Sequence, residues 1–100
     1  MMNSSENILV FSIKNGNILI DGKKSANVKN FIADLKDVDL ATIDKIKHKF
    51  ITFDRSVSNK KGSFVIVCQF SFNDELTIVP TLQEAYDYIE MEEIERQLNT

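Results

Sequence analysis

The chain has 100 residues, 43% of them hydrophobic and 27% charged, and a formal net charge of −3. This length predicts one domain, residues 1–100, with an ordinary globular core. The single cysteine excludes an internal disulfide, and no apolar run approaches the roughly 18 residues that a membrane span needs. Residues 1–6 lack the basic start and apolar run of a signal peptide, so we expect a cytoplasmic protein without a membrane partner.

The first predicted elements are a β-hairpin and a helix. Residues 8–13 and 18–21 flank Asn15-Gly16, a dipeptide that tolerates the positive φ angles of a two-residue hairpin turn. Asp21-Gly22 then ends the second strand, and Ser25 can cap a helix. The apolar residues that follow at helical spacing are Val28, Phe31, Ile32, Leu35 and Val38.

The middle of the chain predicts a short helix, a strand and a basic loop. Leu40, Ile43 and Ile46 fit a short helix over residues 39–47, although an irregular approach to the next strand fits equally well. Residues 50–54 read as a strand and residues 55–62 as a polar loop. The next strand, residues 64–70, begins with a continuous apolar run, which is typical of a strand covered on both faces.

The end of the chain predicts a short strand over residues 76–79 and a long acidic helix. Pro80 ends the strand pairing, and Thr81 and Glu84 form a capping box at the helix start. The apolar residues of this helix change sides halfway along it, from Leu82, Ala85, Tyr86 and Ile89 to Met91, Ile94 and Leu98. Either the helix bends, or the domain wraps around it, or the second group meets another subunit.

These elements together predict an α/β fold, with α+β as the alternative. We expect about four to five strands in one sheet and two to three helices, which is an ordinary content for a small domain. The charges are unevenly distributed, since residues 45–61 are basic and residues 82–98 are acidic. Such asymmetry can steer a charged partner or pair two copies of the chain, although runs of like charge are usually only solvent-exposed faces.

No segment carries a catalytic constellation, so we predict no enzyme, no catalytic or metal-binding residue and no cofactor. His48 and Cys68 lie apart, and neither has the neighbouring ligands or base that metal or nucleophilic chemistry needs. The three glycines form no phosphate-binding pattern. The sequence pI of 5.1 argues against a nucleic-acid partner.

The last third of the chain resembles STAS domains of the anti-sigma-factor-antagonist type. The segment Thr81-Leu82-Gln83-Glu84-Ala85 matches the T-x-x-E-A start of the helix that follows a short edge strand in that family. Residues 63–98 look like small bacterial STAS-like proteins, some of which carry the label ribonuclease Z. Two-zinc enzymes of that kind need several histidines, whereas this chain has one. The label therefore implies at most an association with such an enzyme.

The resemblance also implies a phosphorylatable serine in a loop after a central strand. Ser56 and Ser58 are the positional analogues, in the basic loop predicted over residues 55–62. A phosphate on either serine would add about two negative charges beside lysines and an arginine.

We therefore expect a non-catalytic regulatory or adaptor domain that acts through a protein partner or through self-association, for example as a homodimer. The expected apolar anchors are Met91, Ile94 and Leu98, and the expected charged rim is Glu92, Glu93 and Glu95. One alternative is a phospho-regulated switch of the anti-sigma-factor-antagonist type. Another is an accessory protein of an RNA-processing enzyme.

Overall fold

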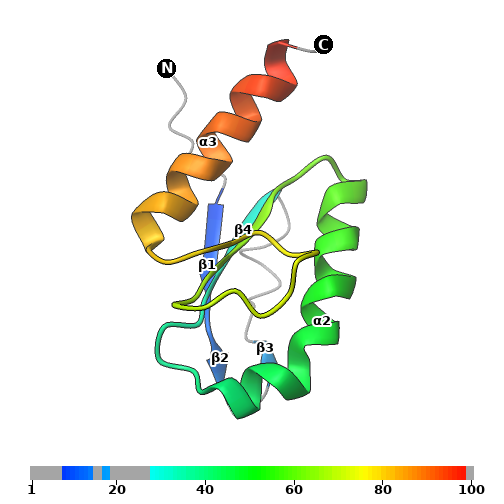
Figure 1. Ribbon diagram of the computed structural model, residues 1–100. Coiled ribbons are helices and arrows are strands. Elements are labelled where there is room, and N and C mark those ends of the chain that lie inside the picture. Colours follow the sequence, from blue (N-terminus) through cyan, green and yellow to red (C-terminus); the bar gives the residue numbers. More distant parts are fainter. Residues whose placement is uncertain (1–7, 15–16, 19–27, 99–100) are drawn as a thin grey trace.

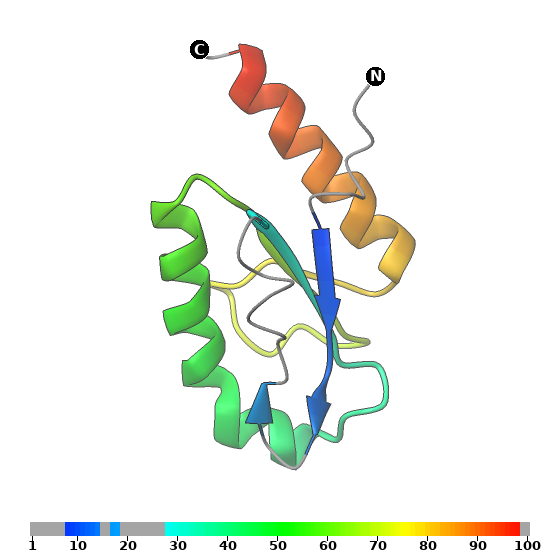
Figure 2. The same cartoon turned by 180° about the vertical axis from the view of Figure 1, so that it is seen from behind.

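The computed structural model describes residues 8–14, 17–18 and 28–98. Within these residues, the main sheet has four parallel strands in the order β1 (Ile8–Phe11), β4 (Asn30–Asp34), β5 (Phe64–Val67) and β6 (Ile78–Val79). The helices α2 (Leu40–Asn59) and α3 (Leu82–Leu98) lie on opposite faces of this sheet (Figures 1 and 2). The predicted α/β class is confirmed.

The core consists of two apolar layers, one on each face of the sheet. Successive side chains of a strand point to opposite faces, so β4 and β5 contribute to both layers. Phe31, Phe64 and Ile66 pack in the layer beneath α2. Ile32, Val65 and Val67 pack in the other layer, with Ala85 and Ile89 of α3. All four residues of β5 are buried, which confirms a strand covered on both faces for residues 64–67. The strand ends at Val67 and does not reach residue 70 as predicted, and Phe70 is exposed.

The predicted helix over residues 25–38 is wrong where the structure describes it. Ser25 lies outside the described residues, and Asn30–Asp34 form strand β4 between β1 and β5. A strand buried on both faces has no alternation of apolar and polar residues. Phe31 and Ile32 of β4 are therefore both apolar, and together with Leu35 they match helical spacing although they belong to no helix.

The predicted strand over residues 50–54 and the predicted loop over residues 55–62 are also wrong, because α2 runs without interruption from Leu40 to Asn59. The helix predicted over residues 39–47 is only its first part. One side of α2 is buried along the whole length, through Ile43, Ile46, Phe50 and Val57. Their spacing by three, four and seven residues is that of a single helical face.

The predicted N-terminal hairpin is confirmed in part. β2 (Ile13–Lys14) and β3 (Asn17–Ile18) pair antiparallel, with Ile13 opposite Ile18 and Lys14 opposite Asn17. Residues 15–16 and 19–21, which the predicted hairpin includes, lie outside the described part of the chain. The first half of the predicted strand, Ile8–Phe11, instead pairs in parallel with β4.

The carboxyl end of α2 forms a Schellman motif, in which backbone N–H groups beyond the helix satisfy its last carbonyls. The N–H of Lys61 donates to the carbonyl of Ser58 at 2.9 Å, and the N–H of Gly62 donates to that of Val57 at 3.0 Å. Lys61 has a φ angle of 62°, the left-handed conformation in which this motif usually has glycine. The turn delivers the chain directly to β5.

Among the described residues, neither helix has a stretch long and apolar enough to cross a membrane.

Candidate functional site

The helix α3 begins at the capping threonine that the sequence predicts. The N–H of Glu84 donates to Oγ1 of Thr81 at 3.2 Å, which is half of the capping box. In place of the reciprocal bond to the backbone, the Glu84 carboxylate accepts a hydrogen bond from the Thr81 hydroxyl at 3.3 Å. The start of α3 is thereby fixed directly after β6.

The side of α3 that faces the domain changes from apolar to polar along the helix. Its first half presents Ala85 and Ile89, both fully buried against the sheet. One and two turns later, the same side presents Glu92, Glu93 and Arg96, which are half-buried. This inward stripe is continuous, so α3 needs no bend to explain the change.

These polar residues meet two buried polar side chains at the amino-terminal ends of β4 and β5. We call Asn30, Ser63, Glu92, Glu93 and Arg96 the polar cluster. The amide of Asn30 donates from Nδ2 to Oε1 of Glu93 at 2.6 Å, and its Oδ1 accepts the N–H of Ser63 at 3.0 Å. The hydroxyl of Ser63 donates to Oε1 of Glu92 at 2.6 Å and accepts from Nη1 of Arg96 at 3.1 Å. Buried polar groups are costly unless paired, and here Asn30 and Ser63 are paired.

The polar cluster holds the second half of α3 in a fixed orientation. Hydrogen bonds to charged groups contribute about 1.5–3 kcal/mol each, more than those between neutral groups. Figures 1 and 2 show that this half of the helix, drawn in orange to red, extends past the amino-terminal ends of the strands. No apolar side chain beyond Ile89 is buried in α3, so polar contacts replace apolar packing there.

Asp54 of α2 adds a further carboxylate near this cluster. Burial raises the pKa of Asp54 above its ordinary value of 3.8, and the nearby Glu92 carboxylate raises it further. An acid whose pKa is raised on folding binds more protons in the folded state than in the unfolded state. The folded state is therefore destabilised as the pH rises through the raised pKa of Asp54.

We expect Asp54→Asn to stabilise the domain at pH 7, because it removes a carboxylate that folding desolvates and places near Glu92. The gain should shrink as the pH falls from neutral through the raised pKa of Asp54 toward 3.8, because the folded wild-type protein takes up its proton in that range. Urea unfolding of both proteins across this pH range measures the difference. A difference that does not vary with pH would contradict the assignment.

The opposite side of α3 is an exposed apolar strip, which we call the outer face. The exposed fractions of Met91, Ile94 and Leu98 are 63%, 50% and 79%. At about 100° per residue these three side chains lie on one side of the helix, roughly opposite Ile89, Glu92 and Arg96. The sequence left three explanations for the change of apolar side along α3: a bend, wrapping by the domain, or contact with another subunit. Because the strip is exposed, the described residues do not wrap around it.

The acidic residues expected to flank this strip divide into two groups. Glu95 is exposed, whereas Glu92 and Glu93 accept hydrogen bonds from Ser63 and Asn30 in the polar cluster. Glu90 and Glu95 are exposed on the two sides of the strip. The sequence pattern could have shown that Glu92 faces the domain, because Glu92 and Arg96 lie on the same side of α3 as the buried Ala85 and Ile89.

Ser56 and Ser58 lie in a different setting from the loop in which the sequence places them. Both are exposed positions in the last two turns of α2. Lys60 follows them as the C-cap of this helix. The structure thus places the predicted phosphorylation residues and the predicted interaction residues on different helices.

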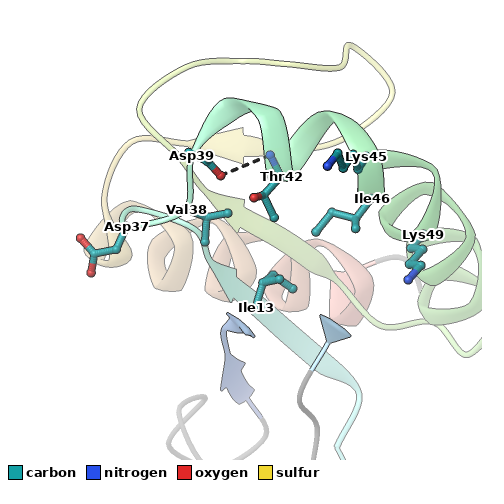
Figure 3. Close-up of a pocket in the computed structure, with 8 residues that line it drawn as sticks. All are labelled: Ile13, Asp37, Val38, Asp39, Thr42, Lys45, Ile46 and Lys49. Atoms are coloured by element: carbon teal, nitrogen blue, oxygen red, sulfur yellow. Dashed lines mark hydrogen bonds between the residues drawn. The ribbon is translucent and has the colours of Figure 1, made fainter. Parts of the chain in front are cut away.

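A surface groove lies at the start of α2 (Figure 3). Its volume is about 680 Å³, and its lining residues are Ile13, Asp37, Val38, Asp39, Thr42, Lys45, Ile46 and Lys49. Asp39 caps the helix by accepting the N–H of Thr42 at 3.2 Å, and hydrogen bonds from Thr42 lower the pKa of its carboxyl. The four charged residues of the lining are exposed and carry both signs, so the groove selects neither anions nor cations by net charge.

The described residues include no group of three or more histidine, cysteine or acidic side chains arranged to hold a metal ion. Cys68 is buried in the apolar layer beneath α2, and His48 is exposed.

Comparison of the chain with protein-family models, curated proteins and solved structures gives no match.

Proposed function

We propose that this chain is a non-catalytic adaptor domain, STAS-like in type, which binds another protein through the outer face of α3. The observation that carries the proposal is the exposure of Met91, Ile94 and Leu98 in one contiguous strip. Single exposed apolar residues are common, but adjacent ones surrounded by charge are typical of interaction surfaces.

The anchoring of α3 supports this proposal. Ile89 is fully buried, and Glu92 and Glu93 accept hydrogen bonds from Ser63 and Asn30, so the strip is presented on a fixed helix. A surface that is already ordered loses less conformational entropy when a partner binds. The resemblance supports the STAS-like type, since a strand, a short strand and a capped helix follow one another over residues 63–98.

We expect Ile94→Ser combined with Leu98→Ser to weaken partner binding by about 30-fold or more. Burying an apolar side chain of this size contributes about 1.5–3 kcal/mol, and these two are half to four-fifths exposed in the free domain. A loss of about 2 kcal/mol corresponds to this change in affinity. The test is affinity capture from the native cell extract, with quantification of each captured protein, together with sedimentation to detect self-association.

The matched control is Leu40→Ser on α2, since Leu40 is 57% exposed and lies off the outer face. This variant should capture the same proteins as wild type. Circular dichroism should show that all three proteins keep their helix content, because the replaced side chains are exposed. The proposal fails if the Ile94 and Leu98 double variant captures and sediments as wild type does.

A further inference from the structure

The outer face of α3 has dimensions that fit one helix of a partner. Met91, Ile94 and Leu98 are separated by three and four residues, which places them one turn apart in a row. At 1.5 Å per residue the row spans about 10 Å along the axis. An occupant must therefore present two or three apolar side chains at similar spacing, as an amphipathic helix does.

The charge around this row is negative and unpaired. Glu90 and Glu95 are exposed on its two sides, and Asp87 precedes Met91 by one turn in the same row. Gln83 donates a hydrogen bond to Asp87 at 3.1 Å, but none of these carboxylates forms an ion pair with any described residue. The one basic residue in the helix, Arg96, belongs to the polar cluster on the opposite side.

A second copy of the chain fits this surface poorly. Pairing α3 with α3 of another copy would bring Glu90 and Glu95 against the same carboxylates, and like charges at an interface are destabilising. The basic helix α2 has the opposite charge, but its only large exposed apolar side chain is Leu40 at its first position. Neither of the two helices described in residues 28–98 combines apolar side chains in a row with basic flanks.

We infer that the outer face of α3 binds a basic amphipathic helix of a partner protein, with apolar residues in the row and lysine or arginine on both flanks. This inference rests on the proposed function and specifies the chemistry of the partner. The apolar row supplies most of the affinity, while Glu90 and Glu95 select the sign of the partner's charge and accelerate encounter.

The test uses the full chain and three synthetic helical peptides of about 18 residues, or about five turns. The first has leucine in one row and lysine elsewhere, the second has leucine and glutamate, and the third has serine and lysine. We expect the leucine–lysine peptide to bind at least about 30-fold more tightly than either of the others. Its affinity should fall as salt is raised from about 50 mM to about 300 mM.

Two variants distinguish specific binding from general attraction to an acidic protein. Glu90→Lys with Glu95→Lys should reverse the preference toward the leucine–glutamate peptide. The matched control, Asp74→Lys with Glu75→Lys in the exposed loop after β5, changes the net charge equally and should keep the preference for the leucine–lysine peptide. Ile94→Ser with Leu98→Ser should reduce the binding of the leucine–lysine peptide to that of the serine–lysine peptide.

The inference is overturned if both charge-reversed proteins prefer the same peptide, or if wild type does not discriminate between the leucine peptides. It is also overturned if sedimentation shows a dimer that Ile94→Ser with Leu98→Ser dissociates. After any of these three outcomes, the proposed function still stands if capture of a partner from the extract depends on Ile94 and Leu98. Capture that is independent of them removes the proposed function as well.

Discussion

Gly62→Ala is expected to destabilise the domain by about 3 kcal/mol, because the new methyl group has no space. A Cβ atom at this position would overlap the carbonyl oxygen of Lys29 and lie 2.8 Å from its carbon. It would also lie 3.0 Å from Cγ1 of Val57. The Lys29 carbonyl belongs to the chain just before β4, and β4 cannot move away without losing the bond from the Phe31 N–H to the Ser63 carbonyl at 2.8 Å.

The neighbouring substitution Lys61→Gly is the control for this prediction. Lys61 has the φ angle of 62°, which L-residues with a side chain adopt at a cost, so glycine should stabilise the domain by about 1 kcal/mol. Urea unfolding measures both changes. A small change in stability for Gly62→Ala would contradict the predicted steric overlap between the new methyl group and the Lys29 carbonyl.

Phe50→Ala is expected to have the other large effect, a loss of about 3–5 kcal/mol in the free energy of unfolding. Phe50 is fully buried, and its ring centroid lies 6.2 Å from that of Phe64 and 6.3 Å from that of Phe72. Alanine would leave a cavity between α2, β5 and the loop after β5. Such a loss can exceed half of the total stability of a small domain.

The control for this prediction is Phe70→Ala in the loop after β5. Phe70 is 41% exposed, so the same truncation should cost about 1 kcal/mol or less. Thermal and urea unfolding of the two variants provide the comparison. Equal losses at the two positions would contradict the placement of Phe50 on the inner side of α2.

The α2 helix shows why part of the fold could not be predicted from local pattern. Phe50, Ile51 and Phe53 form a short apolar group that suits a strand when only five residues are considered. Their helical character appears only when Phe50 is connected to Ile43 and to Val57, over four turns. Short apolar segments are ambiguous between helix and strand, and the length of the pattern decides between them.

The order of elements in the last third of the chain was predictable because its signals are local, although β5 ends at Val67 and β6 begins only at Ile78, within the predicted ranges 64–70 and 76–79. Pro80 and the Thr81 cap fix the start of α3, and the continuous apolar run of β5 indicates its central place. The polar cluster was not predictable in the same way, because Asn30 and Ser63 are far apart in the sequence and neither carries a motif. Only the sheet brings them together, as the first residue of β4 and the residue before β5.

The order of the strands in the main sheet has a consequence for synthesis on the ribosome. The spatial order β1-β4-β5-β6 is also the order in the chain, so each strand adds to the edge left by the preceding one. None of the strands that the structure describes must insert later between two that have already paired. The sheet can therefore grow in step with translation, and α3 covers its second face only after β6 has emerged.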